Sequence, residues 1–231
     1  MRTLACAALL WAGVCAAGLN LGMARPAPLR QVHGRFLPAY PLASLSPLKG
    51  LLIDLWWIQI QTLEADYEFD RIDEIAERIS YLQPFLPKVW EFMAWNVGFN
   101  LSAEATGDPG KQAGYHRKAL ELLRAGLAYN PDSADLHFYK AWFLYKKSQG
   151  EPSFAAELAG DLGEPPLEVA LRELRVADPI GHGDYYRSLF LLQLLLAMDM
   201  KEAAREAVPK VVERFPETRD ELEPLLRRLE P

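Results

Sequence analysis

Hydrophobic residues recur every three to four positions from Leu48 to the end of the chain, which is the pattern of amphipathic helices. The predicted helices cover residues 48–66, 69–82, 88–104, a stretch through Leu123 that ends at Asn130, 133–145, 167–177, 184–198, 201–215 and a last charged segment after Thr218. No stretch shows the strict alternation of a half-buried strand. The sequence therefore predicts an all-α fold.

Short polar signals mark where several of these helices are expected to begin. Gly107-Asp108-Pro109-Gly110 is expected to form a turn between two helices. Ser133 or Asp132 is expected to cap the helix after Pro131. Thr218 and Glu221 fit a capping box for the last helix.

In two stretches, prolines change the helix prediction. Pro209 lies inside the helix predicted over 201–215 and is expected to bend it. Residues 148–166 hold three prolines and three glycines, so we expect a long loop with a short helical turn near 154–158.

The stretch Leu51–Ile60 (LLIDLWWIQI) is apolar nearly all the way round the predicted helix. Such a helix must be covered on more than one side. The neighbouring helix and the preceding linker are one explanation, and contact of Trp56 or Trp57 with a membrane or a partner is the other.

A proline and an Ala-Trp pair repeat along the chain. Ala94-Trp95 follows Pro84 by ten residues and Ala141-Trp142 follows Pro131 by ten, so the two copies are 47 residues apart. A fixed internal period of this length is typical of stacked supersecondary units that bury their faces against one another. We therefore expect a repeat protein, whose usual work is binding.

The full set of motif positions resembles the tetratricopeptide repeat (TPR). That family has a proline between helix pairs, an aromatic residue about six positions later, a small residue ten later, and another small residue twelve before the next proline. The matching residues here are Pro84, Pro131, Pro179 and Pro216 with Trp90, Tyr185, Ala94, Ala141, Ala119 and Ala204, while His137 stands at the second aromatic position. The prolines are 47, 48 and 37 residues apart, longer than the usual repeat of about 34. The resemblance implies a TPR-like α-solenoid of stacked antiparallel helix pairs with inserts.

A second resemblance covers roughly residues 45–147 and includes the stretch KGLLIDLWWIQIQTLEADYEFDRIDEIAERISYLQPFLPKVWEFMAWNVGFNLS. This stretch is similar to a family of bacterial membrane-anchored, TPR-like proteins without an assigned activity. It implies a membrane link and carries no catalytic residue across.

The TPR resemblance also implies where a partner would bind, because the first helix of each pair lines the concave groove in that family. Residues six, ten, thirteen and seventeen after each proline form the buried stripe, and the neighbouring stripe carries large aromatics. The candidate groove residues are Lys88, Glu91, Trp95, Phe138, Trp142, Tyr145, Lys146 and Tyr186. This set suits an extended peptide or an amphipathic helix with acidic flanks. The alternative is that Trp95 and Trp142 fill space between longer helices.

Residues Thr3–Ala24 (TLACAALLWAGVCAAGLNLGMA) carry no charge and hold both cysteines. This composition fits a membrane anchor or a cleavable signal peptide, and we favour the anchor. The chain then divides into an anchor or signal segment (1–24), a linker rich in proline and arginine (25–47) and a helical repeat domain (48–231).

The two signals for membrane orientation disagree. Arg25, Arg30 and Arg35 follow the apolar segment, and the positive-inside rule would keep the domain cytoplasmic. A short N-terminal apolar segment with almost nothing ahead of it usually sends the following chain across the membrane. We favour the extracytoplasmic (periplasmic) side, with the cytoplasmic face as the alternative.

Charge and motif spacing give little sign of nucleic-acid binding, cofactors or catalysis. The net charge is −6 and no basic cluster fits a phosphate backbone. Asp66, Glu68 and Asp70 have calcium-loop spacing, but Arg71 stands where glycine is required. The histidines show no paired ligand spacing.

The interpretation is a non-catalytic, membrane-anchored adapter that binds a protein in an envelope or transporter assembly, with no metal or cofactor. The alternative is an all-helical enzyme acting on envelope glycan. In that alternative Asn96 and Asn100 would work with carboxylates such as Glu91 or Asp54. Otherwise these amides are expected to satisfy neighbouring backbone groups.

Overall fold

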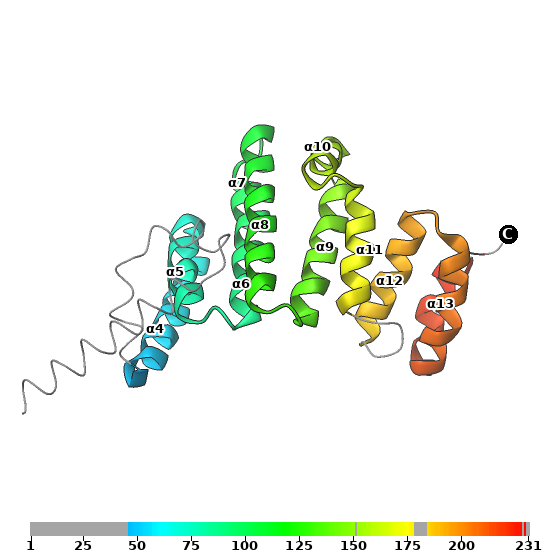
Figure 1. The fold of residues 1–231 in the computed structure, drawn as a ribbon, viewed down its shortest axis with the longest axis horizontal. Helices are drawn as coiled ribbons and strands as arrows, with labels where there is room; N and C mark the ends of the chain where they lie inside the picture. The colour runs from blue at the N-terminus through cyan, green and yellow to red at the C-terminus, as the bar shows by residue number, and fades with distance from the viewer. Residues whose placement is uncertain (1–45, 151, 178–183, 228, 230–231) are drawn as a thin grey trace, which may run out of the picture. The chain divides into compact units, whose positions relative to one another are not determined.

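The computed structural model describes residues 46–150, 152–177, 184–227 and 229. Within these residues every regular element is a helix, so the all-α class is confirmed (Figure 1). The helices divide into two compact units, with the boundary between Pro131 and Asp132. The predicted anchor (1–24) lies outside the described residues, as does all of the predicted linker except its last two residues, which begin the first described helix.

The first unit consists of two long helix pairs. Its elements are α4 (Ser46–Ala65), α5 (Phe69–Leu82), α6 (Pro87–Trp95), the π-helix η2 (Asn96–Leu101), α7 (Ser102–Glu104) and α8 (Pro109–Tyr129). α4 packs on α5, α5 on α6, and α8 runs back along α6 and η2 (Figure 1). The predicted stripe of Trp90, Ala94, Val97 and Leu101 lies in the core, as expected.

One backbone carbonyl ties the two pairs of the first unit together. The Trp90 indole Nε1 donates to the Pro84 carbonyl oxygen at 2.8 Å, and the Asn130 amide donates to the same oxygen at 3.0 Å. The Trp90 ring also stacks on Tyr129, with centroids 5.8 Å apart. The aromatic residue six positions after the proline therefore closes the turn that the proline makes.

The helix predicted over 88–104 is continuous but contains a π-helical segment that the periodicity did not indicate. The buried Asn96 side chain donates to the Phe69 carbonyl of α5 at 3.0 Å, and Asn100 donates to Asn96 at 3.2 Å. The Ser102 hydroxyl donates to the Gly98 carbonyl at 2.7 Å. These side-chain bonds accompany the widened turns, as is common where a π-bulge interrupts an α-helix. The expectation that these amides satisfy neighbouring backbone groups is confirmed for Asn96, whereas Asn100 bonds the side chain of Asn96.

The turn at Gly107–Gly110 is confirmed, and its residues explain the start of α8. Gly107 has a φ of 103°, which favours glycine. Asp108 then caps α8 by accepting from the Lys111 backbone N–H at 3.0 Å, and Pro109 takes the first helical position.

The second unit is built from the remaining helices. They are α9 (Ala134–Gly150), α10 (Pro152–Leu162), α11 (Pro166–Ala177), α12 (Tyr185–Ala197), α13 (Lys201–Arg214), the 3₁₀-helix η3 (Pro216–Thr218) and α14 (Arg219–Arg227). α9 and α11 lie side by side, and α12 packs on α11, α9 and α13 (Figure 1). Pro209 lies inside α13 as predicted.

The predicted loop over 148–166 is wrong for most of its length, because α10 occupies its centre. Phe154 and Leu158 of α10 are buried, and the helix packs on α9 and α11. Pro152 begins the helix, where proline is tolerated, and Gly163 follows its end with a φ of 74°. The residues that suggested a loop are therefore the boundaries of a helix.

Of the predicted caps, Ser133 is confirmed, since its hydroxyl accepts from the Leu136 backbone N–H at 3.3 Å. The Thr218 hydroxyl donates to the Phe215 carbonyl at 2.7 Å. The side chain of its predicted partner Glu221 is outside the described part of the structure. Pro179 and the turn around it are also outside the described residues.

Candidate docking surface

The exposed side of α9 carries a row of aromatic side chains. Phe138, Trp142 and Tyr145 are spaced three to four residues apart and are each partly exposed, with Lys146 exposed beside them. The opposite side of the helix is buried, including Leu136, Phe143 and Leu144. Aromatic residues therefore lie where a surface helix would normally present charged or small polar groups.

α12 extends this aromatic row. The buried Phe190 ring meets Phe138 edge to face at 5.6 Å and Tyr145 at 5.3 Å. Tyr186 lies one turn before Phe190 and is 76% exposed. We call the face formed by Phe138, Trp142, Tyr145, Lys146 and Tyr186 over Phe190 the α9/α12 surface.

Cations lie over two of the rings in this surface. Lys146 Nζ is 5.9 Å from the centroid of Trp142, and the Arg187 guanidinium is 5.5 Å from that of Phe138. Arg187 also pairs with Asp135 of α9, and Asp184 caps α12 by accepting from the Arg187 backbone N–H at 2.9 Å. The surface thus combines apolar faces with the exposed charge of Lys146, because the charge of Arg187 is paired with Asp135 and Asp184.

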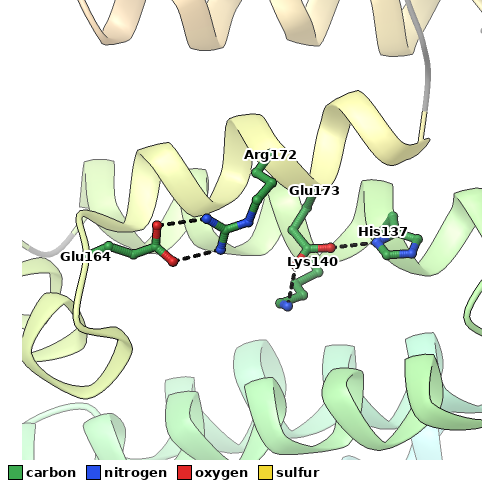
Figure 2. A network of polar contacts seen from close by, with 5 residues as sticks. All are labelled: His137, Lys140, Glu164, Arg172 and Glu173. Carbon is green, nitrogen blue, oxygen red and sulfur yellow. Dashed lines mark hydrogen bonds and ion pairs between the residues drawn. The ribbon is translucent and has the colours of Figure 1, made fainter.

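A charged cluster lies between α9 and α11 (Figure 2). Glu173 of α11 accepts from Lys140 Nζ at 2.5 Å through one oxygen, and its other oxygen lies 2.6 Å from His137 Nδ1. All three side chains are largely buried. A carboxylate only accepts, so Nδ1 of His137 carries the proton in this contact. The cluster fixes α9 against α11 and so holds the row of aromatics in place.

The electrostatics of Glu173 follow from this geometry. Burial by itself raises the pKa of a carboxyl group, but the hydrogen bonds from Lys140 and His137 and their charges outweigh it. The pKa of Glu173 is therefore lowered from its ordinary value of 4.5. Nearby, Arg172 and Glu164 form a bidentate pair at 2.7 and 2.8 Å that joins α11 to the residues after α10 (Figure 2).

The predicted groove residues of the first unit lie on α6. Trp95 is 43% exposed and stacks on Phe99 of η2 with centroids 4.6 Å apart. Lys88 donates to Glu91 at 2.7 Å, so these two pair along one helix. The structure thus places Phe138, Trp142, Tyr145 and Lys146 on α9 and Tyr186 on α12 of the second unit, and places Lys88, Glu91 and Trp95 in the first.

The prediction missed Arg187 and the cluster of His137, Lys140 and Glu173. One signal was present, since His137 replaces the aromatic residue six positions after Pro131, and Glu173 interrupts the apolar stripe of Val169, Ala170 and Leu174. A buried carboxylate requires a cationic partner, which such an interruption indicates.

In the described part of the chain no group of three or more His, Cys, Asp or Glu side chains is placed to hold a metal ion. The described helices also include none with the length and apolar character to cross a membrane. No protein-family model, curated protein or solved structure matches this chain. The class that the structure defines is an all-helical protein whose second unit presents a half-buried aromatic face with Lys146 at its edge.

Proposed function

We propose that this protein is a non-catalytic, membrane-anchored scaffold of TPR-like helix pairs that binds a protein partner through the α9/α12 surface. The observation that carries the proposal is the row of partly exposed aromatics on α9, continued by Tyr186 on α12. In each unit successive helices pack on one another, and the alanines of the repeated motif, Ala94 and Ala141, are buried. Both features support the TPR-like solenoid.

The composition of the surface favours a protein as the ligand. Tyr, Trp and Phe with an arginine are the residues enriched at protein interfaces, because they bury a large area with few rotatable bonds. Lys146 at the edge favours acidic residues on the partner, whereas Arg187 is already paired with Asp135 and Asp184. The partner that fits best is an extended peptide or an amphipathic helix with acidic flanks, belonging to an envelope or transporter assembly.

Anchoring is proposed on the uncharged segment Thr3–Ala24, with the helical units on the extracytoplasmic side and the cytoplasmic face as the alternative. Protease treatment of intact cells and of spheroplasts distinguishes the two. Digestion only after the outer barrier is opened supports the periplasmic side. Protection in both preparations would place the helices in the cytoplasm.

Binding is tested by substituting single residues of the surface. Trp142→Ala and Tyr186→Ala should each weaken partner binding by about tenfold or more, since aromatic residues in such surfaces contribute about 2 kcal/mol. Val176→Ala is the matched control, because Val176 is an exposed apolar residue of α11 in the same unit. The thermal midpoint of each variant is measured in parallel.

Equal binding by all three variants would contradict the docking role. A fall of several degrees in the midpoint for Trp142→Ala would instead show that this ring fills the core. No contact in the described structure favours the glycan-acting alternative, and glycan turnover abolished by one carboxylate substitution would overturn the proposal.

A further inference from the structure

The first described helix has two apolar faces, and the described residues pack against only one of them. Ile53, Ile60 and Leu63 are buried, and Trp57 meets Phe92 of α6 edge to face at 5.3 Å. On the opposite face Leu51, Leu55 and Ile58 are 58%, 53% and 59% exposed. The preceding linker, which was expected to cover a second side of this helix, lies outside the described residues except for residues 46 and 47.

The exposed apolar residues follow the spacing of a coiled-coil seam. Leu51, Leu55, Ile58 and Thr62 are separated by four, three and four residues, the alternation of a and d positions in a heptad. The Thr62 hydroxyl donates to the Ile58 carbonyl at 3.3 Å. Its polar group is thus used within the helix, and its methyl group can contribute to the stripe. We call these four residues the α4 seam.

The residues beside the seam lack the basic charge of a helix that lies on a lipid surface. A helix that lies in a bilayer interface has a broad apolar face flanked by Lys and Arg. The residues that flank the α4 seam are Leu52, Asp54, Gln59 and Gln61, and none is basic. A second helix with the same spacing fits this stripe better.

The residues beside the seam are compatible with a second copy of this chain. Coiled coils that select a different chain use opposite charges at the positions beside the seam. Asp54 is the single charged residue at those positions between residues 51 and 62. In a parallel pair Asp54 would face Gln59 of the other copy, so no like charges meet.

We propose that α4 pairs with α4 of a second copy through Leu51, Leu55, Ile58 and Thr62. A seam this short gives weak pairing by itself. The pairing therefore rests on the membrane anchor of the proposed function, which would raise the effective concentration of the copies. Residues 25–45 are the only chain between that anchor and α4, so anchored copies would hold their seams in one thin layer beside the membrane. The pairing is separate from the α9/α12 surface.

The test is disulfide cross-linking of the full chain in membranes. Cys6 and Cys15 are replaced by serine and Ile58→Cys is introduced, with Glu121→Cys on the exposed side of α8 as the collision control. Two differently tagged copies are co-expressed and oxidised. A specific contact implies that Ile58→Cys gives much more cross-linking than random collision does. We therefore expect the yield of mixed-tag homodimer to be at least about tenfold higher for Ile58→Cys than for Glu121→Cys.

A second variant shows whether the seam itself makes the contact. Leu55→Glu added to Ile58→Cys should lower the homodimer yield about tenfold, because two carboxylates would then meet in an apolar seam. Val176→Glu, another exposed apolar site, should leave the yield unchanged. Leu55→Glu should also leave the thermal midpoint unchanged, because Leu55 is exposed in the single chain.

Several results would overturn the pairing. These are a yield no higher than the collision control, a cross-link to a different protein, or a fall of several degrees in the midpoint of Leu55→Glu, which would show that the chain covers its own seam. If the protein does not fractionate with membranes, the anchor fails. The same cross-linking on concentrated purified full chain then still tests the seam.

Discussion

The two units use different chemistry at the same position of the repeated motif. Six residues after Pro84, Trp90 donates to the Pro84 carbonyl and stacks on Tyr129. Six residues after Pro131, His137 instead contacts the buried carboxylate of Glu173. The first unit thus closes its turn by aromatic packing on backbone, and the second joins α9 to α11 by charge.

The difference has a consequence for each unit. Aromatic packing is insensitive to pH and salt, whereas a buried carboxylate held by Lys140 and His137 depends on its ionisation and on both partners being present. The charged cluster lies behind the helix that carries Phe138, Trp142 and Tyr145. We therefore predict that substitutions in the charged cluster disturb the aromatic face of the second unit, although no residue of that face is changed.

The largest effect is expected from Trp90→Ala. Removing a fully buried tryptophan should lower the free energy of unfolding of the first unit by about 3–5 kcal/mol, since the cavity and the lost hydrogen bond add to the lost burial. Hydrogen exchange read by mass spectrometry should show lost protection in α5 to α8. Trp95→Ala, on the same helix but partly exposed, is the control and should cost about 1 kcal/mol. Equal losses in the free energy of unfolding for Trp90→Ala and Trp95→Ala would contradict this prediction.

The next effect is expected from Glu173→Gln. Lys140 and His137 would lose a charged partner while still largely buried, which should lower the free energy of unfolding by about 3 kcal/mol. The combined variant His137→Phe, Lys140→Met and Glu173→Leu should recover most of the loss, because an apolar set of similar volume has no charge to leave unpaired. Chemical denaturation measures both. A wild-type stability in Glu173→Gln would mean that the cluster does not hold α9.

The same cluster predicts a pH dependence that the aromatic packing of Trp90 does not have. Because the folded pKa of Glu173 is lowered, its stabilising contribution is complete above the unfolded pKa of about 4.5 and is lost as the pH falls through the folded value. The stability difference between wild type and Glu173→Gln should therefore narrow below pH 4.5. The difference between wild type and Trp90→Ala should stay constant over the same range. If the stability difference between wild type and Glu173→Gln stays the same below pH 4.5, the lowered pKa of Glu173 is contradicted.

A smaller effect is expected from Asn96→Ala in the π-helix. The substitution removes the bond to the Phe69 carbonyl and the acceptor of Asn100, at an expected cost of about 1–2 kcal/mol. Lys88→Ala is the surface comparison, since its exposed ion pair with Glu91 should contribute almost nothing measurable. Thermal unfolding of the two variants side by side gives the result. An Asn96→Ala midpoint equal to that of Lys88→Ala would show that the amide does not stabilise this segment.

Much of the fold was predictable because local signals and core packing agree. α5 occupies residues 69–82 as predicted, since its apolar stripe has helical spacing and Pro84 follows its end. α10 was missed because Pro152 and Gly163 suggest a loop unless they are recognised as the first position and the end of a helix. The π-helix was not predictable, because Asn96 acts through a carbonyl 27 residues earlier in the chain.

The candidate site shows the same limit. Helical spacing placed Phe138, Trp142 and Tyr145 on one side of α9, and the structure agrees. Spacing did not show that Phe190 would be buried beneath Phe138 and Tyr145, because that depends on how α12 packs on α9. It also did not pair Glu173 with Lys140, since 33 residues and an unpredicted helix separate them.

Site-specific photocross-linking shows whether the α9/α12 surface binds a protein in the cell. A photoreactive phenylalanine analogue is placed at Trp142, at Tyr186 and, as the control, at Val176, in cells that express the full chain. The account predicts one cross-linked protein shared by positions 142 and 186 and absent at 176. Cross-links at all three positions alike, or at none while the variants fold normally, would contradict it.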